Sequence, residues 1–290
     1  MSNLQYAVHA YAWTASWSNA TLDLIDRARR LGFDRIEIPL MEIEKVDAKA
    51  IRARLAQTGM GVCTSAACSE TNDITGEDGA TRQRGVRYLE RCVRASAAMG
   101  ATVFSGVIYS AIGRRIDGMP GEQYWDRASR GLKRVARMAG DLGVTLGIEP
   151  INRYETFLVN TCEHALLLRE MIDEPNVGIH LDAYHMNIEE EGFYEATWKA
   201  APHLCHYHLS ESHRGIPGTG NVDWNSIYRA LAERGYRGTV GLESFTEVSE
   251  AMRAATCIWR KLAPSSDVLL AQGLRYLRGR ERKWYGAGIA

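Results

Sequence analysis

This sequence lacks the features that are typical of membrane, secreted and nucleic-acid-binding proteins. No stretch approaches the roughly 18 continuous apolar residues of a membrane-spanning helix, and the first residues, Met-Ser-Asn-Leu-Gln-Tyr, lack the basic and apolar segments of a secretory leader. The formal net charge is zero, because 35 basic residues balance 35 acidic ones. Such a protein has no general electrostatic attraction for nucleic acid or anionic membranes. We therefore expect a soluble, cytoplasmic protein that binds a small neutral ligand, with no nucleic acid and no membrane as partner.

Cysteine and glycine motifs are also missing. The six cysteines lie far apart and form no Cys-x-x-Cys pair, so we expect reduced, mostly buried thiols and assign none of them as a nucleophile. No Gly-x-Gly-x-x-Gly turn occurs, which weighs against a two-domain, doubly wound dinucleotide-binding protein. Composition does not indicate disorder, because 46% of the residues are hydrophobic and 24% are charged, as in ordinary globular enzymes.

The sequence does contain a regular alternation of strand-like and helical segments. Short apolar runs predict strands, and apolar residues three or four positions apart predict helices between them. The predicted strands cover residues 6–10, 34–39, 61–66, 102–108, 144–149, 177–182, 204–209 and 239–243. The predicted helices cover residues 21–31, 47–57, 80–99, 123–142, 162–172, 194–201, a segment after Asp223, 248–262 and 266–282. With no linker between these units, they predict an α/β fold with a single domain over residues 1–290, a (β/α)8 TIM barrel with an extra C-terminal helix.

Polar residues end four consecutive predicted strands, at the edge where barrels of this kind have their active sites. Glu149 ends the fifth strand, Asp182 the sixth and Glu243 the eighth, while His208 lies near the end of the seventh. One such residue alone would usually belong to a structural ion pair, but three neighbouring carboxylates next to buried strands would repel one another unless they share a cation. Three oxygen ligands and one imidazole suit Mn²⁺, Co²⁺ or Mg²⁺, so the pattern predicts a divalent metal site.

Other histidines and charged residues lie close to these four in the sequence. His180 and His206 precede Asp182 and His208 by two positions and share their side of the strand, so we expect both to be hydrogen-bonded histidines one layer deeper in the core. The loops that follow the strands add three candidate substrate contacts: Glu155, His185 and Arg214.

Four segments of the sequence resemble one enzyme family. They are residues 147–155 (Gly-Ile-Glu-Pro-Ile-Asn-Arg-Tyr-Glu), 181–190 (Leu-Asp-Ala-Tyr-His-Met-Asn-Ile-Glu-Glu), 206–214 and 241–245. These segments, within a similarity that extends over residues 6–278, resemble the ketose 3-epimerases (D-tagatose, D-allulose or psicose, and L-ribulose 3-epimerases), which are xylose-isomerase-like barrels. The resemblance implies an isomerase that inverts C3 of free ketohexoses or ketopentoses, among them D-tagatose, D-fructose, D-allulose and L-ribulose.

The resemblance implies roles for the four residues at the strand ends. Glu149, Asp182, His208 and Glu243 would bind one metal ion per subunit, usually Mn²⁺ or Co²⁺, and Glu149 and Glu243 would double as the acid/base pair. The proton on C3, next to the C2 carbonyl, becomes removable when a cation stabilises the developing cis-enediolate. One glutamate would remove it from one face, and the other would return a proton to the opposite face. The resemblance also implies a homodimer or homotetramer.

Substrate contacts follow from the same resemblance. Glu155, His185 and Arg214 would hold the O1 to O3 end of the ketose. Three further residues are placed near the distal end, where C4 to C6 would lie: His9, Ser65 and Tyr109.

Three other functions share some of these features. An aldose-ketose isomerase of the hydroxypyruvate or rhamnose isomerase type would use the same barrel and metal but move hydrogen between C1 and C2. An endonuclease-IV-like repair enzyme would need more histidine ligands and a basic face, which the balanced charge does not support. A non-catalytic sugar-binding barrel is the third alternative, although it would not require two glutamates at the metal.

Overall fold

The computed structural model describes residues 3–247 and 249–286. Within these residues, eight parallel strands close into a barrel in chain order, with β1 paired to both β2 and β8. The strands are β1 (Gln5–His9), β2 (Arg35–Pro39), β3 (Gly61–Cys68), β4 (Val103–Ala111), β5 (Thr145–Ile148), β6 (Val177–Asp182), β7 (Leu204–His208) and β8 (Thr239–Leu242). The predicted (β/α)8 TIM barrel is therefore confirmed.

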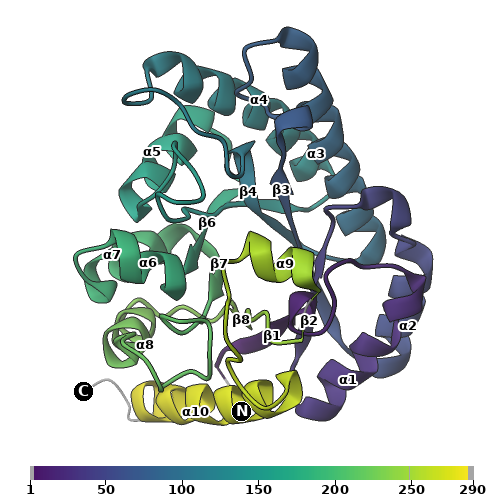
Figure 1. Cartoon of the computed structure of the whole chain (residues 1–290), viewed down its shortest axis with the longest axis vertical. Helices are drawn as coiled ribbons and strands as arrows, with labels where there is room; N and C mark the ends of the chain where they lie inside the picture. The colour runs from purple at the N-terminus through teal and green to yellow at the C-terminus, as the bar shows by residue number, and fades with distance from the viewer. Residues whose placement is uncertain (1–2, 248, 287–290) are drawn as a thin grey trace.

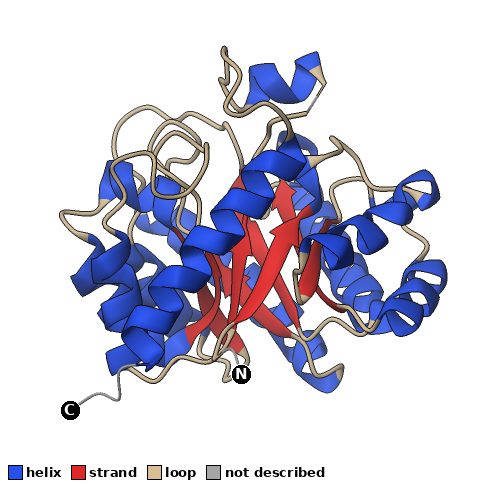
Figure 2. Cartoon of the chain, turned by 90° about the horizontal axis from the view of Figure 1, so that it is seen from below, coloured by secondary structure: helices blue, strands red, loops and turns tan. Residues whose placement is uncertain are grey.

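Helices surround the barrel, and Figure 2 shows the strands at the centre of the molecule with helices on either side. The outer helices are α1 (Asp23–Leu31), α2 (Ala48–Thr58), α3 (Gly79–Met99), α4 (Glu122–Asp141), α5 (Cys162–Ile172), α7 (Phe193–Ala200), α8 (Trp224–Glu233) and α10 (Ser266–Gly286). Local chemistry fixes many of their ends. Asp78, for example, accepts hydrogen bonds from the first-turn N–H groups of Ala80 and Thr81, and Gly100 ends α3 with a left-handed φ of 90°.

Two helices differ from the prediction. A short helix, α6 (Ala183–Glu189), follows β6 directly where no helix was expected. The helix predicted over residues 248–262 was too long: among the described residues of that range only α9 (Glu250–Ala255) is helical, and residue 248 lies outside them. In Figure 1, α9 is seen in projection over the centre of the ring of outer helices, and Figure 2 shows a short helix that stands beyond one end of the strands. None of the helices in the described residues is long and apolar enough to cross a membrane.

Successive side chains of a strand point alternately to the hydrophobic core outside the barrel and to the barrel interior. Ile36 and Ile38 of β2 belong to the hydrophobic core, and Glu37 between them points to the opposite side, into the barrel interior. In the last strands the register pairs Asp182 with His208, so their side chains stand at the same level of the barrel. The polar side chains of β5 to β8 are thereby gathered at one end of the barrel interior.

Candidate active site

Three carboxylates surround one nitrogen of His208 at the C-terminal end of the barrel. His208 Nδ1 lies 3.7 Å from Glu149 Oε1 and 4.0 Å from both Asp182 Oδ2 and Glu243 Oε2. His208 Nδ1 and Asp182 Oδ2 are buried and have no hydrogen-bond partner among the described residues. Buried polar atoms without partners are costly, and a cation bound between them would satisfy both. The structure thus brings together the four residues predicted as metal ligands, in a geometry that fits a divalent cation.

The pKa values in this cluster indicate a shortage of positive charge. Burial raises the pKa of the Glu149 carboxyl well above its ordinary value, and it raises that of Asp182 to about 6. Burial alone would lower the pKa of His208, but Glu37 and the neighbouring carboxylates raise it to about 10. A buried histidine that keeps its proton between carboxylates marks a place where a cation would be favoured.

Arg214 gives Glu243 an environment different from that of Glu149. Its Nη1 donates a 2.8 Å hydrogen bond to Glu243 Oε2, and its guanidinium carbon lies 4.1 Å from the ring centroid of Tyr184 and 4.6 Å from that of Phe245. Burial would raise the pKa of Glu243, but Arg214 outweighs it and the pKa is lowered. The environments therefore shift the pKa values of the two glutamates in opposite directions.

His185 and Glu155 are joined through Asn152 on another side of the cavity. The backbone N–H of Asn152 donates to His185 Nδ1 over 3.1 Å, and the Asn152 side-chain nitrogen lies 2.8 Å from both His185 Nδ1 and Glu155 Oε1. Burial, reinforced by Arg214, lowers the pKa of His185 well below its ordinary value, so the ring is neutral. Because Nδ1 accepts, the proton of the neutral ring is on Nε2, which lies 3.4 Å from Arg214 Nη2 and 3.8 Å from Asp182 Oδ2.

A cavity of about 260 Å³ connects these groups. Its lining includes Glu149, Glu243 and His208 together with the three predicted loop contacts, Glu155, His185 and Arg214. Asp182 is completely buried and lies behind this surface. The structure therefore places the predicted metal site and the predicted substrate contacts around one space.

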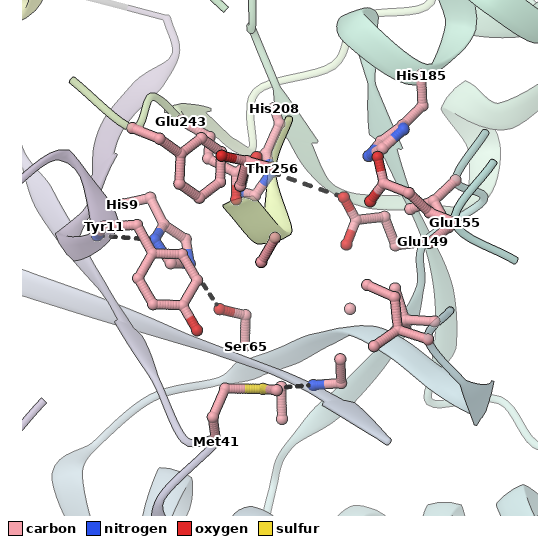
Figure 3. A pocket seen from close by; sticks show the side chains of 18 of the residues that line it. His9, Tyr11, Met41, Ser65, Glu149, Glu155, His185, His208, Glu243 and Thr256 are labelled. Atoms are coloured by element: carbon pink, nitrogen blue, oxygen red, sulfur yellow. Dashed lines mark hydrogen bonds and ion pairs between the residues drawn. The ribbon is translucent and has the colours of Figure 1, made fainter. Parts of the chain in front are cut away.

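His9 and Ser65 line the same cavity, and Figure 3 shows them on the side opposite Glu155 and His185. His9 Nε2 lies 2.9 Å from Ser65 Oγ, and His9 Nδ1 accepts a hydrogen bond from the backbone of Tyr11. Nε2 therefore carries the proton in the neutral ring and donates to Ser65, which leaves the Ser65 hydroxyl proton available to a ligand. Tyr11 also lines the cavity, and no motif or strand end in the sequence pointed to it.

Tyr109 does not line the cavity, contrary to the prediction that it contacts substrate. Its side chain is completely buried, and its hydroxyl lies 2.9 Å from the carbonyl oxygen of Glu149 and 3.1 Å from that of Val159. Tyr109 supports the backbone behind Glu149, and we withdraw it from the candidate substrate contacts.

The deeper histidines were predicted only in part. His206 is a hydrogen-bonded core histidine as expected, with Nε2 2.7 Å from Glu37 Oε2. His180 is also buried, but neither of its ring nitrogens has a hydrogen-bond partner among the described residues, and its Nδ1 lies 3.7 Å from Glu149 Oε2. Glu37 was missed, although a carboxylate between two isoleucines in a short strand was a usable signal, because a buried charge needs a partner.

Comparison with known proteins identifies the family to which the chain belongs. The family model of the xylose isomerase-like TIM barrel matches residues 25–278. A ketose 3-epimerase from Arthrobacter globiformis is 35% identical over 278 residues, which cover 95% of this chain and 96% of that protein. An L-ribulose 3-epimerase from Methylomonas sp. (strain DH-1) is 34% identical over 280 residues, or 96% of this chain and 98% of that protein.

A solved structure shows the same fold over nearly the whole length. The crystal structure of a D-allulose 3-epimerase from Methylomonas sp. in complex with D-allulose matches with a TM-score of 0.91 and 34% identity, covering 97% of this chain and 98% of that one. The chain belongs to the xylose isomerase-like TIM barrel family and, within it, to the ketose 3-epimerases, which are enzymes of the isomerase class.

Proposed function

We propose that this protein is a metal-dependent ketose 3-epimerase that inverts C3 of free ketohexoses and ketopentoses such as D-fructose, D-allulose, D-tagatose and L-ribulose. The observation that supports this most strongly is the pair Glu149 and Glu243, two glutamates that line one cavity beside His208. Inversion needs two groups that can exchange a proton on opposite faces of the carbon, and two glutamates can supply them.

The surroundings of Glu243 and Glu149 suggest which of them removes the C3 proton and which returns one. Arg214 favours the ionised form of Glu243, as a base that removes the C3 proton requires. Glu149, which lines the same cavity, would return a proton to the other face of C3. The residues follow β5 and β8, three strands apart around the barrel, so they approach a bound sugar from different directions. In the reverse reaction the two exchange roles.

The donor set supports a divalent cation held by Glu149, Asp182, His208 and Glu243. Three carboxylates and one imidazole suit Mn²⁺ or Co²⁺, with Mg²⁺ as an alternative, and we propose one ion per subunit. When bound, the cation would polarise the C2 carbonyl and so make the C3 proton more acidic.

Residues around the cavity would orient the ketose. We assign Glu155, His185 and Arg214 to the O1 to O3 end, where the Glu155 carboxylate accepts hydrogen bonds from hydroxyls and the His185 Nε2–H donates one. His9 and Ser65, on the opposite side, would contact the distal end, with the Ser65 hydroxyl as donor. Fixing both ends of the chain holds C3 near the two glutamates.

Incubation with D-fructose in D₂O tests the reaction. We expect D-allulose to appear and deuterium to enter at C3 of the sugar pool, as followed by NMR, because the glutamate that returns the hydrogen to C3 has exchanged its own proton with D₂O. Deuterium confined to C1 would instead identify an aldose-ketose isomerase.

A variant of Glu243 tests the assigned base in the same assay. Glu243→Gln keeps the shape of the side chain but cannot accept the proton, so kcat should fall by about 10²- to 10⁴-fold or below detection. Circular dichroism and metal content would be measured alongside, with the exposed Glu195→Gln as matched control. Unchanged turnover in Glu243→Gln would remove this residue from the mechanism.

A further inference from the structure

A completely buried carboxylate, which the proposed mechanism does not use, lies next to the candidate metal ligands. Glu37 extends from β2 across the barrel interior to residues of β7. Its Oε2 lies 2.7 Å from His206 Nε2 and 2.8 Å from His208 Nε2, and its Oε1 lies 3.6 Å from His9 Nε2. Burying a carboxylate is costly unless it is well paired, so this position calls for a specific explanation.

Protons, and not a second metal ion, connect Glu37 to its neighbours. Separations of 2.7 and 2.8 Å between oxygen and nitrogen are those of charge-assisted hydrogen bonds. Cys63, whose sulfur is 3.9 Å from Glu37 Oε2, would be a further ligand if an ion were bound here. Its thiol instead lies within hydrogen-bonding distance of Glu37 Oε2 and of the carbonyl oxygen of Ile36, each 3.9 Å away.

These hydrogen bonds determine how His208 faces the three other carboxylates. An ionised carboxylate only accepts hydrogen bonds, so His208 Nε2 must carry a proton toward Glu37. In the neutral ring the lone pair is then on Nδ1, the atom that lies 3.7 to 4.0 Å from Glu149, Asp182 and Glu243. The bond to Glu37 therefore selects both the orientation and the tautomer of the ring that a metal needs.

We propose that Glu37 is a positioning residue of the metal centre, which holds His208 with Nδ1 directed at the other three ligands and thereby raises the affinity for a divalent cation. The inference rests on the proposed metal site but not on the identity of the sugar. His206, bonded to the same oxygen, holds the Glu37 carboxylate in place from the other side. Carboxylates that orient a ligating histidine in this way typically contribute about 10- to 100-fold in metal affinity.

The experiment measures Mn²⁺ affinity directly. Metal-stripped wild type, Glu37→Gln, Glu37→Ala and Cys63→Ser are titrated with Mn²⁺, and free Mn²⁺ is followed by electron paramagnetic resonance. We expect affinity to fall by about 10- to 100-fold in Glu37→Ala and by less in Glu37→Gln, whose amide oxygen still accepts a hydrogen bond. Cys63→Ser is the matched control, because Cys63 contacts the same carboxylate but has no contact with His208, and its affinity should equal that of wild type.

A second measurement separates positioning from a general loss of structure. The absorption spectrum of bound Co²⁺ reports ligand geometry, and it should change in Glu37→Gln while the melting temperature of the metal-free variant stays near that of Cys63→Ser. Should Glu37→Ala fail to fold, the nearly isosteric Glu37→Gln decides the question. A folded Glu37→Gln with wild-type Mn²⁺ affinity and an unchanged Co²⁺ spectrum would overturn the inference.

The outcome also distinguishes this inference from the proposed activity. Wild-type protein that binds Mn²⁺ in a Glu37-dependent way but does not epimerise a ketose would support the positioning role and contradict the proposed function. Wild-type protein that binds no divalent cation would overturn both.

Discussion

His208 has a different set of partners on each of its two ring nitrogens. Nε2 faces Glu37, and Nδ1 faces the carboxylates of β5, β6 and β8. Burial and the carboxylates leave protons on groups that a cation would need as bare ligands: the pKa values are about 6 for Asp182 and about 10 for His208, and that of Glu149 is also raised. Metal and protons therefore compete for the same atoms.

This competition predicts that metal binding depends on pH. Below their raised pKa values the ligands hold protons that the cation must displace, so affinity for Mn²⁺ should increase from about pH 5.5 to about pH 8, and binding near pH 7 should release protons. Titration calorimetry in two buffers of different ionisation enthalpy measures this release, because the observed heats then differ in proportion to it. Equal heats in both buffers, with an affinity independent of pH, would contradict the prediction.

Sequence reasoning found the residues whose positions follow from strand ends and missed those that depend on contacts across the barrel. Sequence reasoning could predict four neighbouring residues, because parallel strands place their C-terminal residues together. They are Glu149, Asp182, His208 and Glu243. For Glu37 the sequence contained a signal that it is buried but not the identity of its partners, because its bonds reach 169 and 171 residues along the chain to His206 and His208.

Tyr109 was misplaced for a different physical reason. The register between β3 and β4 shifts between Ala67 and Cys68, whose partners are Val107 and Ala111. Tyr109 was placed by resemblance, and a position carried over in this way need not face the cavity where the strand pairing is irregular.

At the junction between β6 and α6, one residue, Asp182, both caps the helix and faces His208. Asp182 is the last residue of β6 and the N-cap of α6, and its Oδ1 accepts a 2.8 Å hydrogen bond from the backbone of Tyr184 while Oδ2 faces His208. The helix then presents His185 to the cavity one turn later. Apolar spacing did not predict this helix, and Asp182, although it is an ordinary N-cap residue, was interpreted only as a strand end because the helix follows the strand without any loop.

The loop between β7 and α8 is held by a buried residue. Glu211 accepts hydrogen bonds from the backbone of Ser212, Val222 and Gly218 and from the indole of Trp224. These bonds occupy both of its oxygens within its own loop. They fix the segment that contains Arg214, which adopts a left-handed φ of 57°.

Two helical glycines on neighbouring elements predict opposite effects of alanine. In α3, a Cβ on Gly85 would lie 2.2 Å from the carbonyl oxygen of Asn72, so Gly85→Ala should destabilise by about 2 to 4 kcal/mol because backbone must move. In α4, a Cβ on Gly131 would meet Ile74 at 3.4 Å, and Gly131→Ala should be neutral or stabilise by up to about 1 kcal/mol through helix propensity. Urea denaturation of both variants checks this contrast, and equal midpoints would refute it.

For the whole molecule, the barrel was predictable because the same strand-helix unit recurs along the chain in the order in which the strands pair. Strand limits were less certain: β4 continues to Ala111, three residues beyond the prediction, and β5 and β8 end one residue before Glu149 and Glu243. Such limits depend on hydrogen bonds between neighbouring strands, which single-strand patterns do not contain.

The proposed ligands come from four consecutive strands, β5 to β8, so a bound ion would join half of the barrel. Such a site exists only in the folded chain, and free Mn²⁺ at about 100 times its dissociation constant should therefore add about 2.7 kcal/mol to the free energy of unfolding. Melting curves with Mn²⁺ and with EDTA measure this effect, and Asp182→Asn provides a variant with a weakened site. A melting temperature that is the same with metal and with chelator would contradict the prediction.

The shared Glu37 carboxylate also has an evolutionary consequence. His206 and His208 both depend on one of its oxygens, and His9 lies 3.6 Å from the other, so a substitution at any of these positions changes the surroundings of the rest. Effects of such coupled residues are not additive. The four positions form an epistatic unit: the effect of a substitution at one of them should depend on which residues occupy the other three.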